Sequence, residues 1–131
     1  MPKKILITDD TLFMRVTLKN ILTNNGYLEI LQAENGQEAI DKYAAYRPDL
    51  VLMDITMPVM DGISATKKIK SAFPEAKIAM CTALGQKNMV IEAIQAGAKD
   101  FIVKPFTPEK VIETVHRLIG PAEIQEGAKA A

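Results

Sequence analysis

Four short apolar segments of this chain each end at a polar or charged side chain. Residues 5–8 lead into Asp9 and Asp10, residues 50–53 into Asp54, residues 78–81 into Thr82, and residues 101–103 into Lys104. Nearly continuous apolar runs of this length are typical of parallel strands that are covered on both faces. If the segments are neighbouring parallel strands, three carboxylates, an ammonium and a hydroxyl meet at one edge of a sheet. Such a grouping is suited to a divalent cation and a phosphoryl group.

Strand-like and helix-like patterns alternate along the chain. Strands are expected at residues 4–8, 28–33, 50–53, 77–81 and 100–103, and helices at 12–24, 36–46, 63–72, 86–96 and 108–119. The second strand mixes polar and apolar residues, which predicts an edge position. Successive β-α units predict an α/β fold, a three-layer αβα sandwich with a parallel sheet and right-handed crossovers. In such sheets ligands bind beyond the carboxyl ends of the strands, where the polar residues lie.

Local signals predict how the helices begin and which faces they bury. Asn35 is expected to cap the second helix with Glu38 reaching back, and Thr107 to cap the last helix ahead of a proline. Gly97 is expected directly after the fourth helix. In the first helix the expected apolar face consists of Leu12, Val16, Ile21 and Leu22.

Length, charge and cysteine content indicate one domain in a reducing compartment. The 131 residues allow a sizeable core, and a net charge of zero gives no general attraction to nucleic acid or to a membrane. The only cysteine, Cys81, lies in an apolar run and is expected to be a buried hydrophobic residue. No signal peptide or membrane span is recognisable, so we expect a cytoplasmic protein. Residues 1–120 are predicted to form the domain and 121–131 a flexible tail or linker.

The polar cluster carries the chemistry that the sequence suggests. Asp9, Asp10 and Asp54 form an oxygen-rich set that favours Mg²⁺, with Mn²⁺ as the alternative. Lys104 and Thr82 can hold phosphoryl oxygens, and a carboxylate such as Asp54 can attack phosphorus to give an acyl phosphate. Taken singly, the residues have simpler explanations. The acidic pair could cap the first helix, Asp54 could belong to a turn, and Lys104 could be a surface lysine.

These residues together resemble the receiver domain of two-component response regulators, particularly the stand-alone chemotaxis type. The resemblance covers about residues 1–119 and rests on the acidic pair 9–10, Asp54 within Met-Asp-Ile-Thr-Met-Pro, residues 61–62 (Asp-Gly), 82–83 (Thr-Ala) and 104–106 (Lys-Pro-Phe). It implies the flavodoxin-like strand order 2-1-3-4-5. The Phe-Met-Arg sequence at 13–15 and residues 83–86 favour the chemotaxis type over transcription factors.

The resemblance also implies a role for each site residue. Asp54 would take a phosphoryl group from a sensor histidine kinase, and Mg²⁺ would be bound by Asp10, Asp54 and the carbonyl of Thr56, with Asp9 assisting through water. The phosphoryl oxygens would be held by Thr82, the amide of Ala83 and Lys104. The bond before Pro105 would be cis.

The implied output is a protein-binding switch. Thr82 would move toward the phosphoryl group, the ring of Phe101 would turn into the vacated space, and the surface formed by residues 86–119 would change. A downstream target, for example a flagellar motor switch, would bind this surface, without direct nucleic-acid or membrane binding. The protein would be a monomer or weak dimer and would catalyse only its own phosphorylation and slow dephosphorylation.

Two other functions are compatible with parts of the pattern. The domain could belong to a larger DNA-binding response regulator, with residues 121–131 as the start of a linker. A phosphatase with an aspartyl-phosphate intermediate would also combine aspartates, a threonine and a lysine, but such enzymes carry Asp-x-Asp on one strand. A flavodoxin-like FMN carrier is disfavoured, because Asp9 and Asp10 would repel the phosphate.

Overall fold

The computed structural model describes residues 2–83 and 87–122 of the chain. Its elements, in chain order, are β1 (Lys4–Thr8), α1 (Leu12–Asn24), β2 (Glu29–Ala33), α2 (Gly36–Tyr46), β3 (Leu50–Asp54), α3 (Gly62–Ala72), β4 (Ile78–Ala83), α4 (Lys87–Ala96), β5 (Asp100–Lys104) and α5 (Pro108–Ile119). Residue 86 of the fourth predicted helix and residues 123–131 of the predicted tail lie outside the described residues. No helix in the described ranges is long and apolar enough to cross a membrane.

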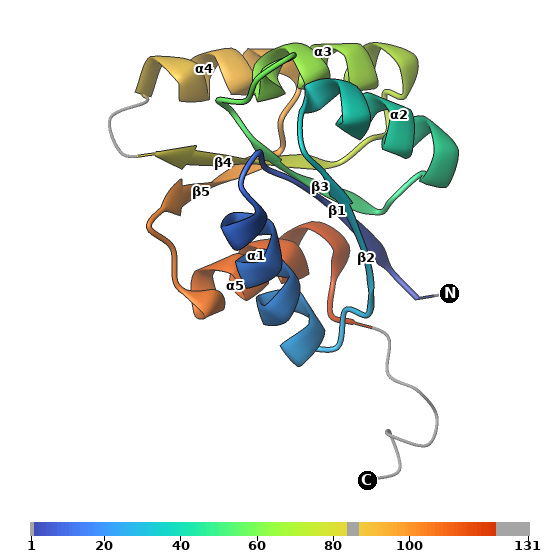
Figure 1. Ribbon diagram of the computed structural model, residues 1–131, viewed down its shortest axis with the longest axis vertical. Coiled ribbons are helices and arrows are strands. Elements are labelled where there is room, and N and C mark those ends of the chain that lie inside the picture. The colour runs from blue at the N-terminus through green and yellow to red at the C-terminus, as the bar shows by residue number, and fades with distance from the viewer. Residues whose placement is uncertain (1, 84–86, 123–131) are drawn as a thin grey trace, which may run out of the picture.

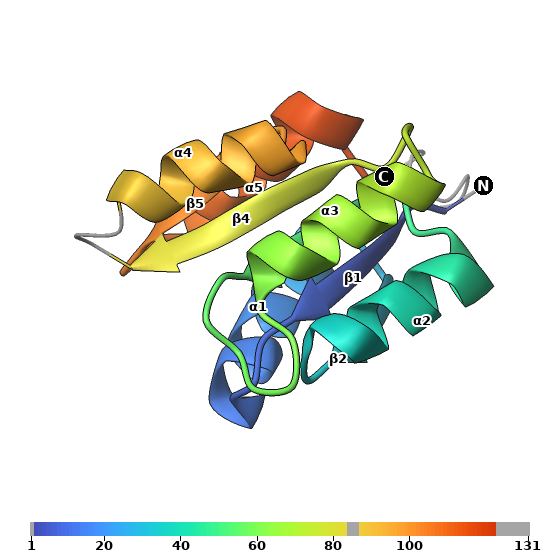
Figure 2. The ribbon, with the colours of Figure 1, turned by 90° about the horizontal axis from the view of Figure 1, so that it is seen from above.

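The sheet has the predicted flavodoxin-like order. Neighbouring strands follow the order β2-β1-β3-β4-β5, and all four pairs are parallel. The polar strand β2 lies at an edge, as its mixed sequence predicted, and β5 forms the other edge. Helices α2, α3 and α4 cover one face of the sheet, and α1 and α5 cover the other (Figure 1). The three-layer sandwich is therefore confirmed, and Figure 2 shows α2, α3 and α4 along one side of it.

Alternation along the strands creates two cores. On β1, Leu6 packs with the layer of α2, α3 and α4, whereas Ile5 and Ile7 pack with α1 and α5. On β4, Met80 and Cys81 divide in the same way. Because successive strand side chains point to opposite faces, the continuous apolar runs bury residues on both sides. Cys81 is buried in the α1/α5 core, as expected for a small hydrophobic residue, and burial raises the pKa of its thiol to about 12.

Three strands extend further than expected and include residues of the polar cluster: β3 and β5 by one residue each, and β4 by two. Asp54 is the last residue of β3 and is in register with Cys81, and Lys104 is the last residue of β5 and is in register with Ala83. Asp54 and Lys104 therefore belong to strand ends that are paired with β4, and not to the loops that follow.

The predicted helix ends are confirmed, with one difference. The side chain of Asn35 caps α2 by accepting a 2.9 Å bond from the amide of Glu38. The carboxylate of Glu38, however, reaches back to the amide of Glu34 at 3.1 Å, one residue before the cap. Thr107 caps α5, and Gly97 follows α4 with a φ of +113°.

The expected apolar face of α1 is wrong at its beginning. Leu12 is 64% and Val16 is 41% exposed, whereas Arg15 and Leu18 are buried together with Leu22. Residues at i, i+3 and i+7 share a helix face, and here that face begins with an arginine. A charged side chain can occupy a core-facing position when polar partners satisfy it, and Arg15 has three such partners, described below.

Candidate functional site

The register of the sheet brings the predicted acidic residues together. Thr8 of β1 is paired with Met53 of β3, so the residues that follow, Asp9 and Asp54, end adjacent strands side by side. Carboxylate oxygens of Asp9, Asp10 and Asp54 all lie within 4.8 Å of one another. The cluster inferred from strand ends in the sequence therefore exists, at the carboxyl edge of the sheet.

Asp9 is the most buried member of this cluster, and both of its carboxylate oxygens have partners. Its residue is 2% exposed, and its Oδ1 accepts bonds of 2.9 Å from both the amide and the hydroxyl of Thr11. Oδ2 of Asp9 lies 3.3 Å from Nζ of Lys104. Thr11, not the acidic pair, is the cap of α1, although Asp9 orients that cap. The capping explanation of Asp9 was thus close to the observed contact, but it accounts for only one of the two carboxylate oxygens.

Asp54 is partly buried and has an altered acidity. Its Oδ1 accepts a 2.9 Å bond from the amide of Ile55 and a 3.2 Å bond from Nζ of Lys104. Burial raises the pKa of Asp54 and the negative charge of Asp9 adds to this, while Lys104 opposes it, and the net change is upward. Among the described residues, no side chain or amide donates to Oδ2 of Asp54, which leaves that oxygen for a ligand.

Lys104 is the only cation bonded to these carboxylates in the described part of the chain. Burial alone would lower the pKa of Lys104, but the charges of Asp54 and Asp9 raise it, and the net change is upward. The ammonium therefore stays protonated. With one cation shared between two carboxylates and Asp10 close by, the cluster retains an excess of negative charge.

This donor set fits a small divalent cation. The three carboxylates supply hard oxygen ligands without a neighbouring sulfur or imidazole ligand in the cluster, and Mg²⁺ and Mn²⁺ prefer such ligands. Bringing three carboxylates within 4.8 Å is unfavourable unless positive charge compensates them. Asp10 is exposed, Asp54 is partly exposed and Asp9 is buried, so the site opens to solvent on one side.

The predicted phosphoryl-binding residues lie around this cluster but do not all contact it. Thr82 is buried near the end of β4, and no hydrogen bond joins it to Asp54 or Lys104 within the described residues. Ala83 is exposed and in register with Lys104. Phe101 is half-buried and packs against the core beneath α2, α3 and α4. By strand alternation Thr82 points to that same face, since Met80 does so.

The loop after β3 packs closely against the backbone of Asp54. The amide of Gly62 donates a 2.7 Å bond to the carbonyl of Ile55. A Cβ atom at Gly62 would lie 2.0 Å from the carbonyl oxygen of Asp54, so only glycine allows this approach. Thr56 is exposed in the same loop. Asp61, quoted for the resemblance, caps α3 through the amide and hydroxyl of Ser64. The peptide bond between Lys104 and Pro105 is cis, the isomer that the resemblance implied.

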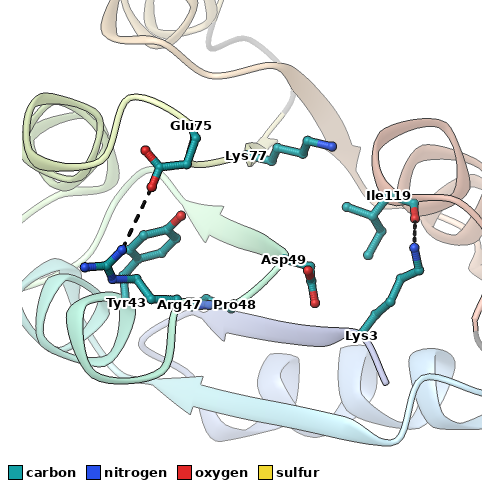
Figure 3. Close-up of a pocket in the computed structure, with 8 residues that line it drawn as sticks. All are labelled: Lys3, Tyr43, Arg47, Pro48, Asp49, Glu75, Lys77 and Ile119. Atoms are coloured by element: carbon teal, nitrogen blue, oxygen red, sulfur yellow. Dashed lines mark hydrogen bonds and ion pairs between the residues drawn. The ribbon is translucent and has the colours of Figure 1, made fainter. Parts of the chain in front are cut away.

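A pocket of about 310 Å³ lies at the opposite edge of the sheet, lined by Lys3, Tyr43, Arg47, Pro48, Asp49, Glu75, Lys77 and Ile119 (Figure 3). Several of its polar groups already have partners. Lys3 donates to the carbonyl of Ile119, Asp49 accepts from the amide of Lys4, and Arg47 lies 4.0 Å from Glu75. This pocket therefore belongs to the stabilisation of the strand beginnings and contains none of the predicted site residues. His116 is exposed on α5 and is also absent from the site.

Sequence reasoning missed one residue next to the site. Arg15 donates a 2.7 Å bond from Nη1 to the carbonyl of Asp9. The available signal was its spacing, because Arg15 precedes Leu18 and Leu22 by three and seven residues and follows Asp10 by five. Leu12 and Val16 were expected on the core face of α1 in its place.

Comparisons with known proteins agree with this geometry. A family model described as the response regulator receiver domain matches residues 5–116. The chemotaxis protein CheY of Bacillus subtilis is 55% identical over 119 residues, which cover 91% of this chain and 99% of that protein. CheY of Thermotoga maritima is 55% identical over 118 residues, covering 90% and 98%. Among solved structures, the CheX-CheY-BeF3-Mg+2 complex from Borrelia burgdorferi matches with a TM-score of 0.84 and 39% identity, over 89% of each chain.

Proposed function

The chain belongs to the response regulator receiver domain family, and from that premise we propose that it is a switch operated by phosphorylation of Asp54. The phosphoryl donor is the phosphohistidine of a sensor histidine kinase. The observation that carries this proposal is the environment of Asp54. One of its oxygens is bonded to Lys104, the other has no protein donor among the described residues, and two further carboxylates lie within 4.8 Å.

The reaction is a direct transfer between two side chains. Oδ2 of Asp54 attacks phosphorus, the new O–P bond forms, and the P–N bond to the donor histidine breaks, with its electron pair leaving on nitrogen. Lys104 remains protonated and stays beside the phosphoryl oxygens, where its charge offsets theirs. The buried surroundings strengthen this attraction, because fewer water molecules screen it. Burial raises the pKa of Asp54, and the positive charge of Lys104 opposes that rise.

The metal proposed for this transfer is Mg²⁺, with Mn²⁺ as a substitute. Asp10, Asp54 and the carbonyl of Thr56 would bind it, and Asp9 would assist through water. When bound, the ion supplies positive charge that neutralises phosphoryl oxygens. The Borrelia burgdorferi relative was crystallised with Mg²⁺ and BeF3, which supports this choice.

The proposed output is a rearrangement that Thr82 and Phe101 transmit. Both side chains belong to the face of the sheet that α4 covers, and β4 and β5 are paired along this stretch. Movement of Thr82 toward a phosphoryl group on Asp54 would leave space for the ring of Phe101. The exposed apolar residues Ile91 and Ile94 of α4 and Val103 of β5 support a protein-binding surface there. A downstream target protein would recognise this surface in the phosphorylated state.

The setting proposed is chemotaxis signalling in the cytoplasm, with a monomer or weak dimer acting on a target such as a flagellar motor switch. The chain covers 99% of the Bacillus subtilis chemotaxis protein at 55% identity, which supports this setting over a DNA-binding response regulator. Slow autodephosphorylation would return the switch to its resting state. A longer reading frame downstream of residue 131 that encodes a DNA-binding module would favour the alternative.

Incubation with acetyl phosphate and Mg²⁺, followed by intact mass spectrometry, tests the acceptor. We expect one added phosphoryl group in the wild type and none in Asp54→Asn. Asp41→Asn, on the exposed side of α2, is the matched control and should be phosphorylated normally. Chelation of the metal should diminish the product. A folded wild-type protein whose mass does not change would overturn the proposal.

The phosphatase alternative is tested by turnover. In one cycle of phosphorylation and dephosphorylation, a receiver domain should release no more than about one equivalent of p-nitrophenol per protein from p-nitrophenyl phosphate. A phosphatase would release many equivalents in the same time. Sustained release that disappears in Asp54→Asn would favour the enzyme.

A further inference from the structure

Arg15 is a buried cation next to the acidic cluster that the proposed transfer does not use. It lies on the core-facing side of α1, and its side chain is almost fully enclosed. Nε donates a 3.1 Å bond to Oε1 of Gln32 on β2, Nη1 donates a 2.7 Å bond to the carbonyl of Asp9, and Nη2 lies 3.8 Å from Oε1 of Glu34. The guanidinium thus joins α1 to the ends of β1 and β2.

The hydrogen bond from Arg15 fixes a backbone carbonyl of the proposed metal site, that of Asp9. The carbonyl of Asp9 belongs to the peptide unit that links Asp9 to Asp10, and this unit is planar. The amide of Asp9 is held as well, by a 3.1 Å bond to the carbonyl of Ala33. With both groups fixed, the orientation of the peptide plane that leads into Asp10 is determined.

Asp10 depends on this support more than its neighbours do. Asp9 and Asp54 each have an oxygen bonded to Lys104, but Asp10 is exposed, and no hydrogen bond or ion pair from another described residue holds its carboxylate. The direction in which this carboxylate points is therefore set by the backbone. A ligand that is not oriented in advance costs conformational entropy when a metal binds.

We propose that Arg15 is a positioning residue of the metal site, which fixes the peptide between Asp9 and Asp10 and so directs the carboxylate of Asp10 toward the cation. Partners that orient metal ligands in this way commonly contribute roughly tenfold to a hundredfold to metal affinity. Because this role presupposes the metal site proposed above, its test has to separate the two.

The sign of the effect on metal affinity separates positioning from simple electrostatics. Arg15 carries a positive charge close to the acidic cluster, so its removal should strengthen cation binding if only charge matters. If Arg15 positions Asp10, its removal should weaken binding. Arg15→Met removes the charge and the hydrogen bonds while retaining most of the apolar stem. Arg15→Lys keeps the charge but loses the planar fork that contacts Asp9 and Gln32 together.

The measurement is the Mg²⁺ dissociation constant of the unphosphorylated protein, by calorimetry and by competition with Mn²⁺ followed by electron paramagnetic resonance. We expect Arg15→Met and Arg15→Lys both to bind Mg²⁺ roughly tenfold more weakly than the wild type. Glu34→Gln, which alters only the exposed partner of Arg15, should stay within about twofold. Leu18→Ala is the control for general loss of core packing on the same helix face and should leave the affinity of the folded protein unchanged.

A second readout is the rate of phosphorylation by acetyl phosphate as a function of Mg²⁺ concentration. The defect of the Arg15 variants should be large at low Mg²⁺ and should diminish at saturating Mg²⁺. Wild-type or tighter Mg²⁺ binding in Arg15→Met would overturn the positioning role, and so would full affinity in Arg15→Lys if Arg15→Met does not fold. A wild-type protein that binds no Mg²⁺ would overturn the metal site itself and Arg15's role with it.

Discussion

Lys104 lies 3.2 Å from Asp54, although β4 separates the strands that carry the two residues. The ammonium of Lys104 crosses over β4 from the edge strand β5 and contacts Asp9 as well, at 3.3 Å. One flexible side chain thereby links the ends of three strands that are not all neighbours. This cation compensates part of the negative charge of the two carboxylates.

Replacement of Lys104 should destabilise the metal-free protein. Lys104→Met leaves Asp9 and Asp54 partly buried without their shared cation, and we expect the free energy of unfolding at pH 7 to fall by about 2 kcal/mol. Part of this loss should be recovered at a lower pH, because the raised pKa of Asp54 favours its uptake of a proton in the folded state. Urea denaturation in the presence of a chelator measures both values. Lys99→Met, at an exposed position, should change stability by less than about 0.5 kcal/mol, and an equal loss in both variants would contradict this account.

The raised pKa of Asp54 predicts the pH dependence of stability. A carboxyl group with a higher pKa in the folded state holds its proton more tightly there, so its contribution to stability is fully present below the unfolded pKa and is lost as the pH rises through the folded pKa. The ionised form of Asp54 therefore lowers the free energy of unfolding at pH 7. Without metal, Asp54→Asn should be more stable than the wild type by about 1 kcal/mol at pH 7, and the gain should vanish near pH 3.

Added Mg²⁺ should reverse this order, because only the intact carboxylate cluster binds the ion well. At a concentration of one hundred times the dissociation constant, ligand binding stabilises a protein by about 2.7 kcal/mol. Thermal denaturation with and without Mg²⁺ measures the reversal. Asp41→Asn should behave like the wild type throughout. If Mg²⁺ stabilised Asp54→Asn as much as the wild type, Asp54 would not be a metal ligand.

Gly62 should tolerate no larger residue. A Cβ atom there would overlap the carbonyl oxygen of Asp54 at 2.0 Å, so Gly62→Ala has to displace either the loop or the end of β3. We expect a loss of about 3 kcal/mol in unfolding free energy, together with slower phosphorylation. Gly120→Ala is the comparison, because Gly120 has a φ of +79° and a ψ of 177° but space around it, and this backbone conformation alone should cost about 1 kcal/mol. Similar losses would show that the close approach is unimportant.

Thr8→Val should stabilise the protein. Thr8 precedes the acidic pair and is buried, and its Oγ1 is the only fully buried side-chain nitrogen or oxygen that lacks a hydrogen-bond partner among the described residues. Valine has a similar shape and removes the unpaired hydroxyl, which predicts a gain of about 1 kcal/mol. Thr114→Val is the matched control, since the buried hydroxyl of Thr114 donates to the carbonyl of Lys110 at 3.0 Å. An equal gain at both positions would refute the explanation.

Prediction from the sequence succeeded where a local pattern carries the information. The apolar runs identified the strands, because a strand buried on both faces needs continuous hydrophobic side chains. The polar residues after the runs predicted the cluster of carboxylates with Lys104, since parallel strands place their carboxyl ends at one edge. The capping residues Asn35 and Thr107 were predictable because they bond to amides only three residues away.

Prediction failed where a contact joins distant parts of the chain. Leu12 and Val16 were expected in the core, and Arg15 occupies it instead. A buried arginine looks unfavourable in a helix considered alone, and it becomes acceptable only through the carbonyl of Asp9 and the side chain of Gln32. Neither partner belongs to α1, so hydrophobic patterning within the helix could not identify them.

The sequence by itself determined the order of the elements and the set of residues that meet at the carboxyl edge of the sheet. Only the tertiary structure decided that Lys104 reaches both Asp9 and Asp54, that no hydrogen bond joins Thr82 to either side chain among the described residues, and that Arg15 bonds to the carbonyl of Asp9. The physical reason is the separation along the chain between the residues that interact. Strand and helix preferences depend on residues a few positions apart, whereas the charge balance of the site depends on distances of 3 to 5 Å between side chains that only the packed sheet establishes.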